Sequence, residues 1–317
     1  MDYKNNLFSS NDPNKIAQFY ESFEERDELI EWMRERHKGK AQIIEFDSDS
    51  SIVVVIPTSD INGTYSKNCR ESIFKGFRLI FVTSGDFKDP YFNYAHCINV
   101  GLKKAMEYNP KWIVISDDDM IKIDEPAKLS EEISKVEEDS DVLFAKMGTR
   151  HSKLAAISDM NFVGNFLNRV IYALSRARGK EIGFTSWESF QNKIFNKYRV
   201  TYRTRPNSFV FWDLFYHRKT FFIVYSSFVI FRAEFIKNRG EEYLDETFVN
   251  GYEDQYLSLE IKKKNVKYRF IDFAIEDAAY GTLGTGSIPR IVRDFCNGVY
   301  FDDKIKSNVI FGGRIRN

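Results

Sequence analysis

The stretch Tyr91 to Asp124, YFNYAHCINVGLKKAMEYNPKWIVISDDDMIKID, holds a predicted helix, a turn, a strand and an acidic edge in that order. Apolar residues recur at helical spacing over residues 99–107, and the helix is expected to end at Asn109 because a residue before proline avoids the α region. The run WIVIS at 112–116 is almost continuously apolar, which is typical of a strand covered on both faces.

Three consecutive carboxylates, Asp117, Asp118 and Asp119, follow this strand directly. Carboxylates at the carboxyl end of a strand gain no core burial and repel one another, and in open α/β sheets this edge is where ligands bind. A divalent cation that bridges to phosphate oxygens would neutralise them, and hard oxygen ligands suit Mg²⁺ or Mn²⁺. A solvated acidic turn is the alternative, and the buried type of strand in front of the turn favours the ligand site.

Two more β-rich runs precede this strand, IVVVI at 52–56 and RLIFV at 78–82, and each leads into a polar turn. Predicted helices separate the three strands. The chain is therefore expected to belong to the α/β class, with a doubly wound, mostly parallel central sheet and flanking helices. Neither GxGxxG nor GxxxxGK[ST] occurs near the turns, which argues against a dinucleotide enzyme and against a P-loop NTPase.

The overall composition suits a large core with balanced surface charge. The 317 residues are 43% hydrophobic and 16% aromatic, and the formal net charge is +0, so no nucleic-acid partner is expected. The three cysteines, Cys69, Cys97 and Cys296, lack metal-binding spacing and predict a reducing, cytoplasmic setting. Neither a signal peptide nor a membrane-spanning run is recognisable in the sequence.

The flanking regions show simpler patterns. An apolar stripe from Pro13 to His37 predicts one amphipathic helix, and FFIVYSSFVIF at 221–231 predicts one buried strand. The tail from Arg290 to Asn317 is basic, contains glycine and shows no specific pattern.

A basic and aromatic segment spans residues 147–220. It contains 13 Lys and Arg against four Asp and Glu, a local charge of about +9, with aromatic residues throughout. This composition fits a positively charged structural subdomain. It also fits a lid or seat for an anionic acceptor, a lipid phosphate or a membrane surface, so peripheral contact with an anionic membrane is one expectation.

A second acidic site, Glu253-Asp254, begins a predicted amphipathic helix that follows Gly251-Tyr252. The helix dipole stabilises carboxylates in a first turn by about 0.3–1 kcal/mol each, which is the purely structural explanation of the pair. The same dipole is expected to lower the pKa of Asp254 and leave it ionised at neutral pH. A functional explanation divides the labour between the two sites. The first holds a cation on a leaving diphosphate, and the second takes a proton from an attacking hydroxyl.

Both acidic motifs stand in segments that resemble GT-A-fold glycosyltransferases, chiefly family 2 and the β-1,4-galactosyltransferase and chondroitin-polymerase type. FNYAHCINVGLKKA and the following SDDDM are similar to that family's FNRAxxLNVGxxxA…DVDM. FVNGYEDQYLSLEI is similar to its acceptor-side segment, which ends in a Gly-rich Glu-Asp motif. The resemblance covers about residues 52–271 apart from the basic segment. The matching residues are Phe92, Asn93, Ala95, Asn99, Val100, Gly101, Asp117, Asp119, Gly251, Glu253 and Asp254.

The resemblance implies an inverting, metal-dependent transferase of the hexosyltransferase type. Its donor is a UDP- or GDP-sugar, and its acceptor is a hydroxyl on a glycan or a lipid-linked molecule. Asp119 is implied as the ligand of Mn²⁺ or Mg²⁺, with Asp117 near the ribose or reaching the metal through water. Asp254 is implied as the catalytic base, and Glu253 as the residue that positions the acceptor. Nucleotide contacts are implied for Pro57, Thr58, Ser84, Asn93, Asn99 and Asp117.

The patterns along the chain, together with the resemblance, predict a division into consecutive segments. These are an N-terminal helix and connector (1–50), a nucleotide-sugar-binding half (51–146), the basic insertion or lid (147–220), an acceptor-side half with the Glu-Asp motif (221–286) and a C-terminal tail (287–317).

The chain departs from the family pattern at three places. Tyr94 stands where the family has a basic residue, residues 248–250 (FVN) replace a tryptophan-rich acceptor motif, and no histidine follows His217 to supply a further metal ligand. Two alternatives remain open. One is a catalytically inactive module that binds a glycan or anionic lipid. The other is a nucleotidyltransferase, although TSDINGTYS at 58–66 lacks the basic Gly-rich loop usual in that class.

Overall fold

The computed structural model describes residues 2–83, 91–136, 140–147, 154–159, 184–206, 219–222, 227–240, 242–278 and 288–307. The chain divides into two compact units. Unit 1 comprises residues 1–35, 153–222 and 286–317, and unit 2 comprises residues 36–152 and 223–285. The N-terminal helices, the described part of the basic segment after residue 153 and the C-terminal helix therefore belong together, although they are far apart in the sequence. Across the described ranges, no helix is both long and apolar enough to cross a membrane.

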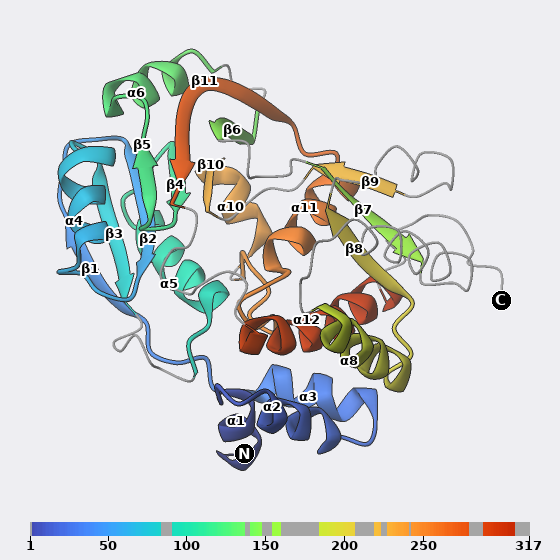
Figure 1. Ribbon diagram of the computed structural model, residues 1–317. Helices are drawn as coiled ribbons and strands as arrows, with labels where there is room; N and C mark the ends of the chain where they lie inside the picture. The colour runs from blue at the N-terminus through green and yellow to red at the C-terminus, as the bar shows by residue number, and fades with distance from the viewer. Residues whose placement is uncertain are drawn as a thin grey trace, which may run out of the picture. The chain divides into compact units, whose positions relative to one another are not determined.

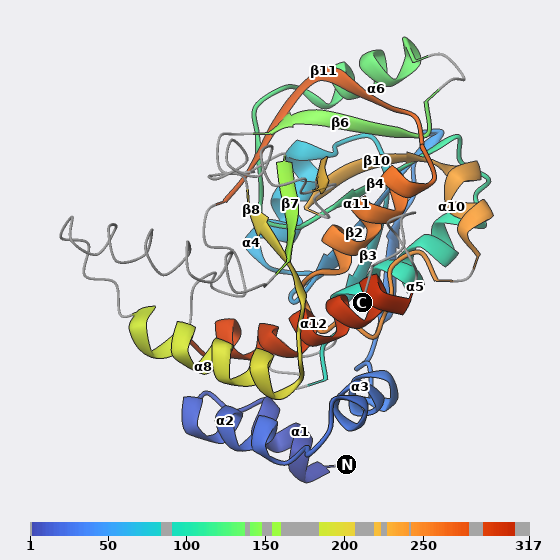
Figure 2. The same ribbon diagram turned by 90° about the vertical axis from the view of Figure 1, so that its right-hand side faces the viewer.

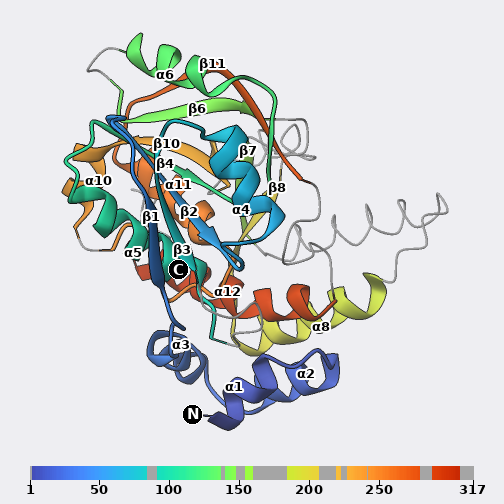
Figure 3. The same ribbon diagram turned by 90° about the vertical axis from the view of Figure 1, so that its left-hand side faces the viewer.

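Unit 2 is built on an eight-stranded sheet with the order β1-β3-β2-β4-β10-β6-β11-β5, part of which is seen in Figures 1 and 3. The central strands β2 and β4 are buried along their whole length, as their apolar runs predict. The α/β class expected from the sequence is thus confirmed. The strands are β1 (Gln42–Phe46), β2 (Ile52–Thr58), β3 (Arg78–Thr83), β4 (Trp112–Ser116), β5 (Met120–Lys122), β6 (Val142–Met147), β10 (Phe228–Arg232) and β11 (Tyr268–Asp277).

The prediction of a mostly parallel sheet is wrong, because the sheet is mixed. Parallel pairing joins β2 to β3, β2 to β4, and β6 to β11. Antiparallel pairing joins β1 to β3, β5 to β11, and β10 to both β4 and β6. A continuous apolar run specifies that a strand is covered on both faces, but it does not specify the direction in which the strand runs. Strand β10 is an example. It lies between β4 and β6 and runs antiparallel to both, although its sequence is as apolar as theirs.

Helices cover the two faces of this sheet with separate apolar cores. On one face, the π-helical turn Cys69–Ile73, which follows α4 (Thr64–Asn68), contributes to a core with inward residues of β2, β4 and β11. On the other face, α5 (Tyr94–Met106) and α11 (Glu253–Lys263) contribute to a core with the alternate residues of β2, β3 and β4. The helix α6 (Pro126–Ser134) also contributes to the first core, and α10 (Ala233–Arg239) to the second.

Gly101 allows α5 to lie close against the sheet. A Cβ atom at this position would come within 2.4 Å of a methyl group of Val55 and 2.8 Å of one of Val82. We expect Gly101→Ala to lower the free energy of unfolding by about 1–2 kcal/mol, because overpacking outweighs the gain in helix propensity. Lys103→Ala, an exposed change on the same helix, should stay within about 0.5 kcal/mol of the original chain. Chemical denaturation measures both variants, and a Gly101→Ala protein as stable as the original would contradict this close packing.

Unit 1 combines five helices of the described chain with a small antiparallel sheet of order β8-β7-β9. Figure 2 shows α8 and α12 running side by side, and the two helices contact each other. Asp302 on α12 is fully buried and connects α12 with two other segments of the unit. It receives hydrogen bonds from Arg26 (2.7 Å) and from the backbone N–H groups of Thr201 and Tyr202. The elements are α1 (Asp2–Phe8), α2 (Pro13–Glu21), α3 (Arg26–Glu35), α8 (Phe184–Lys197), α12 (Ile288–Ser307), β7 (Leu154–Asp159), β8 (Tyr202–Pro206) and β9 (Lys219–Phe222).

Three expectations about these flanking regions are corrected. The predicted helix from Pro13 to His37 is two helices, because Ser22 closes α2 and a Glu28 carboxylate accepts the backbone N–H of Glu24 at the start of α3. The apolar run 221–231 contributes to two different strands, β9 and β10. The described part of the C-terminal tail, up to Ser307, belongs to the 20-residue helix α12, and residues 308–317 lie outside the described residues.

Candidate functional site

The backbone at the carboxyl end of β4 is held from two sides. The N–H of Asp117 donates to the carbonyl of Ser227, just before β10, at 2.9 Å. The carbonyl of Asp119 accepts from the N–H of Ala278, just after β11, at 2.8 Å. The side chains of Asp117 and Asp119 are partly exposed. The acidic edge predicted from the sequence is therefore a fixed feature of the sheet rather than the middle of a free loop.

Asp118 points into the protein and has a structural environment. Its side chain is 7% exposed and accepts a hydrogen bond of 2.7 Å from Thr58 Oγ1, which lies 2.8 Å from Ser66 Oγ. The Cys69 thiol donates to the Asp118 carbonyl at 3.2 Å. These contacts fix the acidic edge to the end of β2. They also use the Thr58 hydroxyl, which the resemblance implies as a nucleotide contact.

Among the other implied nucleotide contacts, Pro57 lies in the buried strand β2 and Ser84 falls outside the described residues. For these positions the implied contact stays a prediction.

The two outer carboxylates hold their protons more tightly than ordinary aspartates. Burial, followed by the charge of Asp119, raises the pKa of Asp117 to about 7. Burial and the charges of Asp118 and Asp277 raise the pKa of Asp119 to about 6. Both shifts have the sign expected when carboxylates are crowded in a poorly solvated place. A nearby cation would act in the opposite direction and lower both pKa values.

A metal site built from protein groups alone is not present in the described residues, since no three His, Cys, Asp or Glu side chains there are grouped to hold an ion. Asp117 and Asp119 nevertheless suit Mg²⁺ and similar ions, which are often bound by one or two carboxylates together with substrate phosphates. The donor set therefore fits a metal that is completed by a diphosphate.

Tyr94 contacts this edge from the first residue of α5. Its hydroxyl donates to Asp117 Oδ1 at 2.9 Å. The sequence offered one signal of this contact: Tyr94 occupies the place where the resembling family has a basic residue. A neutral phenol in that place holds the carboxylate by a hydrogen bond and adds no positive charge.

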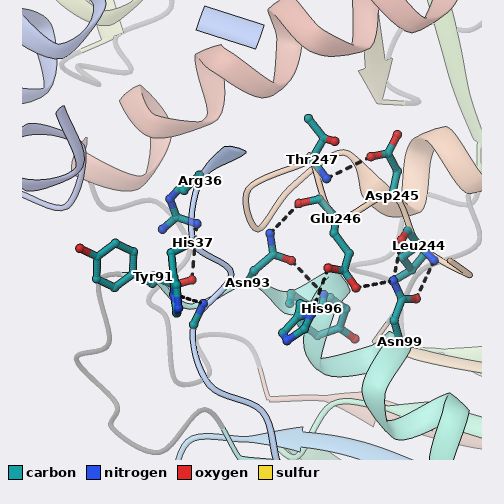
Figure 4. A network of polar contacts seen from close by, with 12 residues as sticks. Arg36, His37, Tyr91, Asn93, His96, Asn99, Leu244, Asp245, Glu246 and Thr247 are labelled. Atoms are coloured by element: carbon teal, nitrogen blue, oxygen red, sulfur yellow. Dashed lines mark hydrogen bonds and ion pairs between the residues drawn. The ribbon is translucent and has the colours of Figure 1, made fainter. Parts of the chain in front are cut away.

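Asn93 and Asn99 use their amides to hold the segment 243–248, as Figure 4 shows. Asn93 Nδ2 donates to the carbonyls of Glu246 and Phe248 at 2.9 and 3.0 Å, while its Oδ1 caps α5 by accepting the N–H of His96. Asn99 Nδ2 donates to the Leu244 carbonyl and to Glu246 Oε1, and its Oδ1 accepts the N–H groups of Tyr243 and Leu244.

Both asparagines are almost fully buried, with 1% and 7% exposure. The other carboxylate oxygen of Glu246 lies 3.0 Å from His96 Nδ1. We therefore assign Asn93 and Asn99 to positioning the segment that leads to the Glu-Asp motif and propose no direct nucleotide contact for them.

Asn99→Ala should be strongly destabilising, because it leaves two buried N–H groups and a buried carbonyl without the amide that binds them. We expect the free energy of unfolding to fall by about 2–4 kcal/mol. Asn62→Ala, at an exposed position, is the matched control and should change it by less than about 0.5 kcal/mol. Urea denaturation of the three proteins makes the comparison. Equal midpoints for Asn99→Ala and Asn62→Ala would show that the amide contacts contribute little.

Glu253 and Asp254 are the first two residues of α11, as the sequence predicts. The side chain of Glu253 is 7% exposed, and that of Asp254 is partly exposed. The expected lowering of the Asp254 pKa is wrong. Burial raises the pKa to about 6, although the backbone N–H of Gln255 donates to its Oδ1 at 2.7 Å and opposes the shift. A carboxylate with this pKa is largely ionised at neutral pH and is a stronger base than an ordinary aspartate.

Comparison of the sequence with models of known protein families finds no match, and a comparison with curated proteins finds none either.

Proposed function

We propose that the chain is an inverting glycosyltransferase with a GT-A-like fold, which moves a sugar from a nucleoside-diphosphate sugar to a hydroxyl of a glycan or lipid-linked acceptor. One observation carries the proposal. The N-terminus of α5 contacts Asp117 at the acidic edge through Tyr94, and it also holds residues 246–250, which lead into Glu253 and Asp254. The N-terminus of α5 thus contacts Asp117 at one carboxylate site and the segment that leads to the other.

The chemistry assigned to the site is a single displacement. The acceptor oxygen attacks the anomeric carbon of the donor sugar, the bond between that carbon and the diphosphate oxygen breaks, and the acceptor proton passes to a base. Attack from the face opposite the leaving group inverts the anomeric configuration. A poor nucleophile such as a sugar hydroxyl needs a base at the right place, and Asp254 has a suitable pKa for this role.

The leaving diphosphate carries negative charge that must be stabilised as the bond breaks. Asp117 and Asp119 would hold Mn²⁺ or Mg²⁺, which when bound supplies positive charge to the diphosphate oxygens. Asp118 has a different task, because its hydrogen bonds fix the carboxyl end of β4 to β2. Glu253, beside the proposed base, is assigned to orienting the acceptor hydroxyl.

A panel of UDP- and GDP-sugars, incubated with the protein and Mn²⁺ or Mg²⁺, tests the reaction class. Release of nucleoside diphosphate, measured by chromatography with and without a mixture of glycan acceptors, supports the proposal. Release of pyrophosphate instead indicates a nucleotidyltransferase. Glycan binding without release of either product indicates an inactive binding module.

A further inference from the structure

The side-chain amide of Asn250 binds the backbone on both sides of Asn93, at the start of α5. We call this pair of hydrogen bonds the bracket. Its Oδ1 accepts the backbone N–H of Tyr94 at 2.8 Å, and its Nδ2 donates to the carbonyl of Phe92 at 3.1 Å. The two bonds reach over Asn93, whose own amide donates in the reverse direction to the carbonyl of Phe248 at 3.0 Å. The two segments therefore hold each other through reciprocal side-chain-to-backbone bonds, although they are 156 residues apart.

The backbone after this bracket is strained. Asn250 has φ of 53° and Tyr252 has φ of 71°, both in the left-handed region. Asparagine tolerates this region, but a bulky residue such as tyrosine seldom adopts it. Such conformations persist where surrounding contacts enforce them, often at functional sites. Here they come directly before Glu253 and Asp254, so they set the direction in which α11 begins.

Tyr94 links the bracket to the acidic edge. Its backbone N–H is held by Asn250, and its hydroxyl is held by Asp117. A shift of Asn250 would therefore change two positions: that of Tyr94 on the donor side and that of the α11 start on the acceptor side. Asn250 itself belongs to the sequence FVN, in which the chain departs from the tryptophan-rich pattern of the family that it resembles.

We propose that Asn250 is a positioning residue that fixes the base Asp254 relative to the donor-side carboxylate Asp117, acting through Tyr94 and the left-handed turn at 250–252. This inference rests on the proposed function. It assigns Asn250 no contact with the donor. Loss of its amide should therefore lower the rate of the chemical step and leave donor affinity unchanged, since misplacing a catalytic group by about 1 Å can cost as much as 10²-fold in rate.

The test compares three variants for kcat and for the Kd of the donor nucleotide sugar. Asn250→Gly removes the amide and still permits the positive φ. Asn250→Asp keeps an oxygen to accept the Tyr94 N–H and loses the donor to Phe92. Asn265→Gly is the matched control, because Asn265 is an exposed asparagine with φ of 50° that follows the other end of α11.

We expect kcat of Asn250→Gly to fall about 10- to 100-fold, with a smaller fall for Asn250→Asp and no change for Asn265→Gly. The donor Kd should stay within about threefold in all three, a difference of less than 1 kcal/mol. Should Asn250→Gly fail to fold, the same comparison is made between Asn250→Asp and Asn265→Gly.

The outcomes separate this inference from the proposed function. If the original chain transfers sugar, and the Asn250 variants match Asn265→Gly in kcat, the positioning role is overturned and the proposed function stands. A fall in kcat that comes with an equal loss of donor affinity also overturns it, because Asn250 would then act on binding. If the original chain transfers no sugar from any donor, the proposed function fails and this inference fails with it.

Discussion

Asp254→Asn is expected to lower the rate of sugar transfer by about 10²–10⁴-fold, the usual range for loss of a general base, while nucleotide-sugar affinity stays near its original value. An acceptor hydroxyl attacks poorly until its proton is taken, whereas donor binding needs no such step. Loss of the helix-dipole interaction alone, about 1 kcal/mol at most, could not produce this effect. Transfer at the original rate by a folded Asp254→Asn protein would show that Asp254 serves only the start of α11.

Two further measurements sharpen this prediction. Because burial raises the pKa of Asp254 to about 6, transfer by the original chain should fall as the pH drops below about 6, where the base becomes protonated. Glu253→Gln removes the same charge from the same helical turn and is the matched control. It should mainly raise the KM of the acceptor and reduce kcat far less than Asp254→Asn. Equal kinetic defects in the two variants would contradict the separate roles.

Asp119→Ala should abolish the gain in nucleoside-diphosphate affinity that Mn²⁺ or Mg²⁺ provides. Asp119 is the carboxylate implied as the direct ligand of the cation, whereas Asp117 is implied near the ribose or as reaching the metal through water. Asp49→Ala removes an exposed carboxylate from the same unit and should leave the gain unchanged. Calorimetric titration with UDP and GDP makes the comparison. A full metal-dependent gain in Asp119→Ala would place the cation elsewhere.

The core of unit 2 could be predicted from the sequence because local patterns determine it. The runs IVVVI and WIVIS are apolar throughout and become buried strands, and the carboxylates that follow WIVIS lie at a sheet edge. The same patterns do not encode strand direction or long-range pairing. Strand β10 runs antiparallel to β4 and β6, and nothing local in FVIFR expresses that direction.

The missed features of the candidate site all depend on contacts between distant segments. The Tyr94 hydroxyl meets Asp117 23 residues later, and its backbone meets Asn250 156 residues later. The raised pKa of Asp254 arises from burial, which the helix-start pattern cannot reveal. In unit 1, the helix α12 could not be predicted from the sequence because a glycine, Gly298, lies within it. Gly298 faces the ring of Phe195, where a Cβ atom would lie 2.7 Å from Cζ, so packing explains the residue.

The most direct test of the central claim is calorimetric titration of the original chain with UDP and with GDP, in Mn²⁺ and then in EDTA. This measurement needs no knowledge of the acceptor or of the sugar. We expect at least one nucleotide to bind about tenfold or more tightly with the metal, a difference of about 1.4 kcal/mol. Equal affinity with and without EDTA for both nucleotides would contradict a metal-bridged diphosphate at Asp117 and Asp119.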